Sequence, residues 1–141
     1  PGTWSFEAHE AYDSYRFHGT VPSKEMADWA PSFLPEGYIE SKRTDLGTLM
    51  EITYDCKDLD MWITFSYLRL AEGSGFDLDN EHHVVTEISV QGMDGYLYTA
   101  SEDKLNAVVW FNETLRYGFL LSSRLPPDTL LKVAESVNTK S

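Results

Sequence analysis

An acidic segment in the middle of the chain has the residue types and the spacing of a metal-binding loop. The carboxylates of Asp77, Asp79 and Glu81 stand at alternate positions, as the oxygen ligands at the start of a calcium loop do. Such a loop needs glycine at its sixth position and glutamate at its twelfth, but these positions hold His82 and Ile88. We therefore interpret the segment as a solvated loop, with cation binding as the open alternative.

Two adjacent histidines, His82 and His83, follow this segment and could indicate zinc. Neighbouring side chains on an extended chain point to opposite sides, so the two imidazoles are not expected to share one metal ion. The other histidines, His9 and His18, are remote in sequence and lack ligand spacing. The sequence therefore predicts no metal site and no cofactor.

Nucleophilic and acid–base residues stand in no recognisable catalytic setting. Cys56 is the single cysteine, and no histidine or asparagine accompanies it in a protease signature. Carboxylates are abundant, but the sequence contains no identifiable glycosidase pair, nucleophile elbow, phosphate-binding glycine loop or dinucleotide fingerprint. We predict no catalytic residues and expect the chain not to be an enzyme. A hydrolase that uses acidic residues is the third hypothesis, and it requires a pocket carboxylate with a strongly raised pKa.

Aromatic side chains are the remaining candidates for a binding site. Trp29, Trp62 and Trp110, together with eight tyrosines, could line a groove for a glycan or a peptide. Aromatic residues are also common in strands because they pack well on a pleated surface. Since these residues show no clustering beyond the strand period, we favour packing over ligand binding.

Composition and charge exclude several classes of partner. The 141 residues include 23 acidic and 11 basic side chains, which gives a formal net charge of −12. A surface of this sign repels polyphosphate, so nucleic-acid binding is excluded and direct binding to an anionic membrane is disfavoured. No apolar run in the sequence reaches the roughly 18 residues that a membrane span needs. The chain begins at Pro1-Gly2 without a methionine, and we expect a signal or a membrane anchor upstream.

The sequence divides into an extended N-terminal arm over residues 1–21 and a single domain over residues 22–141. The arm is polar and aromatic without a clear period, and a short strand is expected at 15–20. A short helix is expected over 23–30, since a serine and a glutamate mark its first turn. Pro31 ends this helix because proline disfavours helical geometry in the residue before it.

Alternating apolar and polar residues predict strands through most of the domain. The expected strands span residues 38–43, 48–55, 61–70, 84–91, 96–99, 106–111 and 115–122. Apolar residues occur on both faces of 61–70, which places this strand near the centre of the sheet. Residues 71–83 are expected to form a loop because glycine, serine and acidic residues dominate them.

The chain closes with an amphipathic helix that begins near Pro126-Pro127-Asp128. Leu130, Ala134 and Val137 recur at helical spacing, and two further apolar residues widen the stripe. Strands joined by short turns favour an antiparallel meander. We therefore predict an α+β fold, a twisted antiparallel sheet of about six or seven meander strands with the C-terminal helix packed on one face.

Four short phrases, taken in their order and spacing, resemble a bacterial domain family of unknown function, DUF4367, over about residues 29–139. The phrases are Phe33-Leu34-Pro35-Glu36-Gly37-Tyr38, Val90-Gln91-Gly92 followed by Gly95-Tyr96-Leu97-Tyr98, Val109-Trp110 followed by Tyr117, and Ala134-Glu135-Ser136-Val137. The resemblance implies a domain of Gram-positive bacteria that lies outside the membrane, at the C-terminal end of single-span proteins that include anti-sigma factors. It offers no catalytic residues.

The leading hypothesis is an extracytoplasmic, non-enzymatic domain of a membrane-anchored bacterial protein, at the cell surface or secreted. We expect it to act in sensing or protein interaction, as an anti-sigma-factor-like regulator would. The alternative is a module that binds a cell-wall glycan, lipid or peptide on the sheet face that the helix leaves free. The expected partner is a protein or a cell-envelope ligand, and membrane contact is expected only through an upstream anchor.

Overall fold

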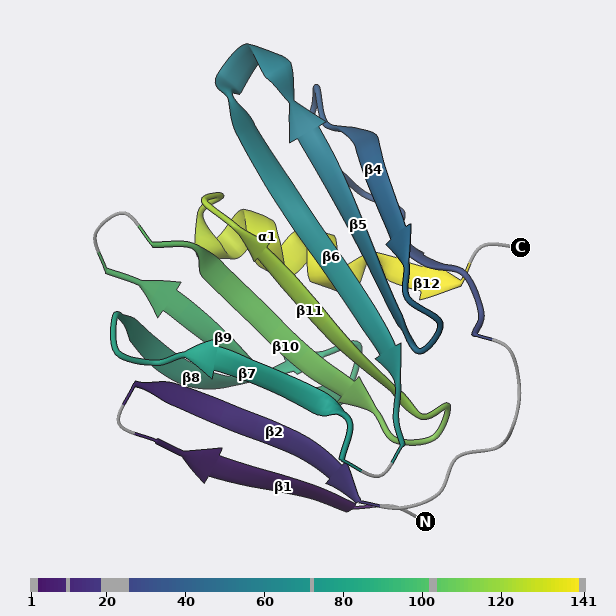
Figure 1. Cartoon of the computed structure of the whole chain (residues 1–141). Helices are drawn as coiled ribbons and strands as arrows, with labels where there is room; N and C mark the ends of the chain where they lie inside the picture. The colour runs from purple at the N-terminus through teal and green to yellow at the C-terminus, as the bar shows by residue number, and fades with distance from the viewer. Residues whose placement is uncertain (1–2, 10, 19–25, 72, 102–103, 140–141) are drawn as a thin grey trace.

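The computed structural model describes residues 3–9, 11–18, 26–71, 73–101 and 104–139. These residues form three antiparallel sheets, of seven, three and two strands, and an α-helix near the C-terminus (Figure 1). None of the helices in this part of the chain is long and apolar enough to cross a membrane. The fold class is α+β with sheet predominating, as the sequence pattern predicts.

The large sheet contains the predicted strands in the order β4-β5-β6-β11-β10-β9-β8, and all neighbours are antiparallel. Its strands are β4 (Ile39–Asp45), β5 (Leu49–Cys56), β6 (Met61–Arg69), β8 (His83–Val90), β9 (Met93–Ala100), β10 (Asn106–Asn112) and β11 (Tyr117–Ser123), with a short 3-10 turn at Lys57–Leu59. Two meanders, β4 to β6 and β8 to β11, meet where β6 pairs with β11. The connection from β6 to β8 therefore crosses to the far edge of the sheet.

The central strands carry one side of the hydrophobic core. Ile52, Phe65 and Leu121 are register partners on β5, β6 and β11, and all three are fully buried. Side chains at every second position of a strand share a face, so this row continues along each strand. The central position predicted for the strand over 61–70 is confirmed, because β6 lies between β5 and β11.

Helix α1 (Pro127–Glu135) covers this face of the sheet, as predicted. Leu130, Val133 and Ala134 are fully buried against the core that β10 and β11 contribute. The helix ends before Val137, which instead begins the short strand β12 (Val137–Thr139).

The helix expected over residues 23–30 is wrong where the structure describes it. Residues 26–28 are not helical, and residues 23–25 lie outside the described part of the chain. The next residues form strand β3 (Trp29–Pro31), which pairs with β12. Backbone hydrogen bonds to β12 therefore outweigh the local helix signal, which rested only on a serine and a glutamate in the first turn.

The N-terminal region is more ordered than the extended arm that we expected. Strands β1 (Thr3–Ala8) and β2 (Tyr12–His18) form a hairpin, and β2 pairs with β7 (Gly75–Asp79). Strand β7 lies inside the segment expected to be a loop, so that expectation is wrong for residues 75–79. In both β2 and β7 the buried side chains occur at every second position, as Tyr15 and Phe17 do on β2 and Phe76 and Leu78 do on β7.

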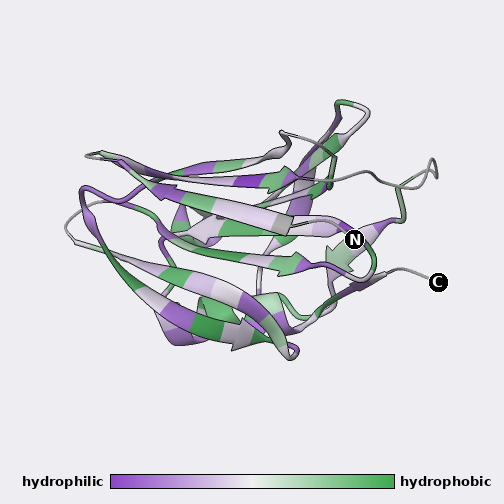
Figure 2. Cartoon of the chain, turned by 90° about the horizontal axis from the view of Figure 1, so that it is seen from below, coloured by the Kyte–Doolittle hydropathy of each residue, from purple (hydrophilic) through white to green (hydrophobic). Residues whose placement is uncertain are grey.

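This three-stranded sheet packs on the face of the large sheet that α1 leaves free. Phe17 and Phe76 join Leu70, Tyr98 and Val109 in a second hydrophobic core, separate from the core under the helix. Figure 2 shows apolar and polar residues alternating along the stacked strands, as two buried layers require.

Candidate functional site

A groove of about 850 Å³ lies where the N-terminal hairpin meets the large sheet. Its lining comes from β1 and β2, from β9 and β10, and from the turns that connect β8 to β9 and β10 to β11. Grooves of this size at the junction of two packed units are the usual location of ligand-binding sites. We therefore treat this groove as the candidate functional site.

Aromatic rings form the floor of the groove. The Trp4 ring lies 3.8 Å from that of Phe111, and the Phe6 ring stacks on Tyr96 with centroids 6.2 Å apart. Tyr15 lies between these pairs, 5.6 Å from both Tyr96 and Phe111. Phe6 is 51% exposed and offers its ring to a bound molecule. The floor can therefore bind an apolar or aromatic group by stacking.

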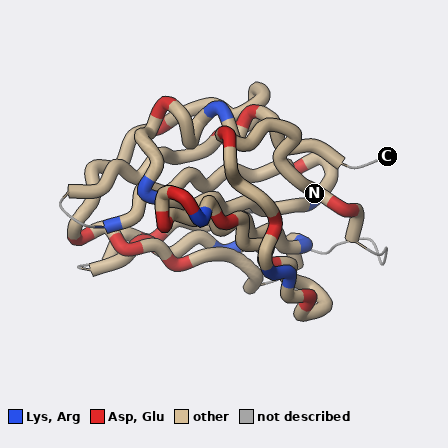
Figure 3. The backbone as a smooth tube through the Cα atoms, turned by 90° about the horizontal axis from the view of Figure 1, so that it is seen from above, with Lys and Arg blue, Asp and Glu red and all other residues tan. Residues whose placement is uncertain are grey.

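The rim of the groove is polar and acidic. Asp94 and Glu113 supply carboxylates, and Gln91 and Asn112 supply amides. Among the described residues that line the groove, none is lysine or arginine. Burial raises the pKa of Tyr96, and the negative charges of Glu87 and Asp94 raise it further. The groove therefore favours a positively charged ligand, in keeping with the acidic positions distributed along the backbone in Figure 3.

The β8–β9 turn at this rim is held in place by the C-terminal segment. The Glu135 carboxylate accepts hydrogen bonds from the Gln91 backbone N–H at 3.1 Å. The Gln91 side chain donates to the carbonyls of Glu135, at 2.8 Å, and Val137, at 2.6 Å. Gln91 has a φ of 53°, which is uncommon outside glycine, so these bonds stabilise a strained turn.

A buried hydrogen-bond network lies behind the floor. Tyr98 donates its hydroxyl to Asp13 Oδ2 at 2.6 Å, and the Tyr15 hydroxyl lies 2.6 Å from that of Tyr98. Burial raises the pKa of both tyrosines, so their hydroxyls remain protonated. The network fixes the Tyr15 ring in the groove, and Asp13 is too deeply buried to contact a ligand.

The residues proposed from the sequence as calcium ligands do not act together. Arg16 donates two hydrogen bonds to the Asp77 carboxylate, both at 2.9 Å, which occupies both of its oxygens. Burial alone would raise the pKa of Asp77, but hydrogen bonds from Arg16 and Ser14 lower it overall. Asp77 is therefore engaged in an ion pair, and the alternating calcium pattern is broken at its first position.

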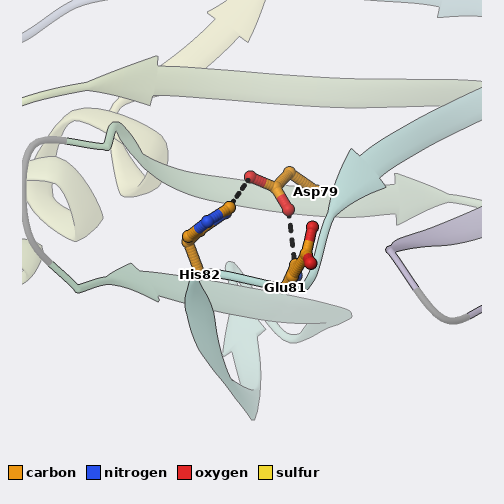
Figure 4. A group of neighbouring side chains, drawn as sticks. All are labelled: Asp79, Glu81 and His82. Carbon is orange, nitrogen blue, oxygen red and sulfur yellow. Dashed lines mark hydrogen bonds and ion pairs between the residues drawn. The ribbon is translucent and has the colours of Figure 1, made fainter.

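Asp79, Glu81 and His82 do come together, at the turn between β7 and β8 (Figure 4). Their potential ligand atoms all lie within 4.8 Å of one another. His82 belongs to the turn and His83 begins β8, so the two histidines are not successive residues of one extended strand. The expectation for an extended strand therefore does not apply to this pair, and both Nδ1 atoms approach Asp79.

The three tryptophans named from the sequence do not gather in one site. Trp110 and Trp29 are buried in the core under the helix, whereas Trp62 is 40% exposed on β6, away from the groove. Cys56 is buried in the same core. The packing interpretation is therefore confirmed for Trp29 and Trp110.

Sequence reasoning missed the residues that form the groove, above all Trp4, Phe6 and Tyr96. Trp4 and Phe6 are two positions apart on β1, so the period of two was present but too short to stand out. The contact between β1 and β9 joins segments about 90 residues apart, and no local pattern reports such a contact.

A comparison with models of protein families identifies the family of the chain. The family model described as a domain of unknown function (DUF4367) matches residues 28–137. The chain belongs to this family. No curated protein matches the chain, and no solved structure matches it. The groove residues of β1 and β2 (Trp4, Ser5, Phe6 and Tyr15) precede the matched residues and the other groove residues fall within them, so the groove lies between the DUF4367 domain and an N-terminal hairpin.

Proposed function

We propose that this chain is a non-enzymatic binding domain that acts in protein interaction or sensing, and that the groove holds a segment of its partner. The single observation that carries the proposal is the aromatic floor between two packed sheets, closed by an acidic rim. Interfaces concentrate their binding energy in aromatic anchors that are surrounded by polar residues.

The partner that fits this chemistry is a basic peptide segment with apolar or aromatic side chains. Lysine or arginine would pair with Asp94 and Glu113, and cations are also attracted to the faces of aromatic rings such as Phe6. The net charge of −12 speeds the approach of such a partner and slows that of an anionic one. A protein partner is thus favoured over an acidic or uncharged cell-wall polymer.

The proposal includes a location outside the cytoplasmic membrane, in an anti-sigma-factor-like or related envelope protein. Its support is membership of the DUF4367 family, together with the expectation attached to the sequence resemblance. In this setting, binding of an envelope protein in the groove would act as the signal that this domain passes to the rest of the membrane-anchored protein. Accessibility of the domain to protease added to intact cells tests the location.

Calorimetric titration tests the binding proposal with three probes. The first is a short peptide in which lysines alternate with leucine and tryptophan, the second replaces its lysines with glutamates, and the third is a chitin oligosaccharide. We expect the lysine peptide to bind and the other two not to bind. Tight binding of the oligosaccharide, or equal binding of both peptides, would contradict a basic protein partner.

Matched variants locate the site. Phe6→Ser removes an exposed ring from the groove and should weaken binding of the lysine peptide by about tenfold or more, as loss of an anchor residue does. Leu59→Ser removes an apolar side chain of similar exposure outside the groove and should leave the affinity unchanged. Equal losses in the two variants would mean that the peptide does not bind in the groove.

A further inference from the structure

The turn between β7 and β8 contains a cluster of metal-ligand side chains that is separate from the groove. Asp79 Oδ1 accepts a hydrogen bond from the Glu81 backbone N–H at 2.9 Å, which leaves Oδ2 directed at the histidines. His82 Nδ1 lies 3.2 Å from Oδ2 and His83 Nδ1 lies 3.9 Å from it. The nitrogens of two imidazoles therefore approach the same carboxylate oxygen, that of His82 more closely than that of His83.

His83 gives the independent indication that a cation belongs there. Its side chain is 7% exposed, and its Nε2 lies 2.7 Å from the carbonyl oxygen of Leu105. A carbonyl can only accept, so Nε2 carries the hydrogen and Nδ1 of the neutral ring carries a lone pair. That buried Nδ1 has no hydrogen-bond partner within the described structure, and the polar atom facing it at 3.9 Å is a carboxylate oxygen.

The unpartnered Nδ1 of His83 faces the carboxylate of Asp79, a side chain that is 43% exposed, and a cation between the two groups would satisfy both. We propose that Asp79, His82 and His83 bind a divalent transition-metal ion of the zinc class, with Glu81 available as a further oxygen ligand. Imidazole nitrogen and carboxylate oxygen are the ligands that zinc takes in proteins, whereas calcium takes oxygen ligands. The hydrogen bond from His83 Nε2 to a carbonyl is the outer contact that metal-binding histidines normally make.

The backbone of the turn is fixed before any ion binds. Asn80 donates from its side-chain amide to Asp13 Oδ1 at 2.5 Å and to the His9 carbonyl at 3.1 Å. The backbone N–H and the hydroxyl of Ser101 both donate to the His82 carbonyl, at 2.8 and 2.9 Å. Coordination at about 2.0–2.2 Å then requires rotation of the side chains but no refolding of the turn.

The proposed metal site must also accommodate a nearby cation, the ammonium group of Lys104. Lys104 lines a hollow of about 300 Å³ together with Asp79 and His83. The Lys104 side chain is exposed, so its ammonium can remain in solvent when a metal ion takes the carboxylate. Replacement of Lys104 by methionine should therefore strengthen metal binding.

Zinc titration of the full chain, without a histidine affinity tag, tests the proposal by calorimetry. We expect one Zn²⁺ per chain, and no binding of Ca²⁺ at the same concentration. His83→Gln and Asp79→Asn should each weaken zinc binding by more than about tenfold, since even outer contacts of metal ligands contribute about 10–100-fold. His18→Gln removes a histidine at the opposite end of β2 and should change nothing. Equal zinc affinity in all of these variants would overturn the site.

Imidazole nitrogen NMR of the wild-type chain decides the question even if a variant fails to fold. Equimolar Zn²⁺ should shift the Nδ1 resonances of His82 and His83 and leave those of His9 and His18 in place. Three results would overturn the proposal: absence of any shift, shifts confined to His9 and His18, or a proton retained on His83 Nδ1 in the presence of zinc. The last result would mean that a proton on the His83 imidazolium, paired with the Asp79 carboxylate, supplies the positive charge in place of a metal ion.

Discussion

The hydroxyl of Tyr98 donates to Asp13 Oδ2 at 2.6 Å and so joins two parts of the chain that differ in family membership. Tyr98 lies on β9 within the residues matched to DUF4367, whereas Asp13 lies on the N-terminal hairpin before them. Both residues are buried between the large sheet and the three-stranded sheet. The hairpin is therefore an integral part of the folded unit, and the aromatic groove depends on it.

Removal of this hydroxyl should destabilise the chain. Tyr98→Phe leaves the buried Asp13 carboxylate without one of its donors, and we expect a loss of about 1–3 kcal/mol in the free energy of unfolding. Tyr12→Phe, at an exposed position of the same hairpin, is the matched control and should have little effect. Urea denaturation of both variants measures the difference, and equal midpoints would show that the bond contributes nothing to stability.

Addition of one methyl group at Gly75 should separate the N-terminal hairpin (β1 and β2) from β7. A Cβ on Gly75 would lie 1.6 Å from the Tyr15 carbonyl oxygen, closer than any side chain tolerates. Gly75→Ala should therefore break the pairing of β2 with β7, at a cost of about 1–3 kcal/mol or more. Hydrogen exchange should accelerate in β2 and β7, whereas β10 and β11 retain protection as an internal reference. Unchanged exchange in β2 would mean that the two strands do not pair as described.

The strands of the large sheet and the closing helix follow from local pattern, because each buries alternate or helically spaced apolar residues. Leu130 and Ala134, for example, are buried as their spacing predicts. The paired strands β3 and β12 have three residues each, which is too short for any period to be visible. The strand expected at 15–20 is confirmed over residues 15–18 of β2, and residues 19–20 lie outside the described part of the chain. Strand β7 was missed because glycine, serine and acidic residues, which indicate a loop, surround its two buried apolar residues. The groove could not be predicted because packing of distant segments creates it.

Docking of the closing helix has a direct test in Leu130→Ala. Leu130 is fully buried under the sheet, so truncation removes apolar burial and leaves a cavity, with an expected loss of about 2–4 kcal/mol. The exposed Leu59 provides the control, and Leu59→Ala should change stability by less than about 0.5 kcal/mol. A denaturant melt of Leu130→Ala that matches wild type would mean that α1 is not docked.

The Arg16–Asp77 pair should contribute stability that depends on pH. The pKa of Asp77 is lowered below 3.8 in the folded chain, so folding favours the ionised carboxylate. The contribution is therefore complete above the unfolded pKa and disappears as the pH falls through the folded pKa. Because the pair is partly exposed, Asp77→Asn should lower the free energy of unfolding near neutral pH by about 0.2–1 kcal/mol.

Urea denaturation of wild type and Asp77→Asn at a series of pH values measures how this difference in the free energy of unfolding depends on pH. The two curves should converge at pH values below the folded pKa of Asp77, where the wild-type carboxyl is protonated. A difference that stays constant into strong acid would show that the substitution acts through packing, with no role for the ion pair.

The central claim, that the aromatic groove is the recognition surface, is tested most directly by amide and indole NMR during titration with the lysine-containing peptide. We expect saturable shifts of the Trp4 indole N–H and of the amides in the two rim turns, residues 91–94 and 112–115, with little change around Trp62. Shifts that gather on the β4–β6 face around Trp62, or no saturable shifts at high peptide concentration, would contradict the assignment of this groove as the binding site.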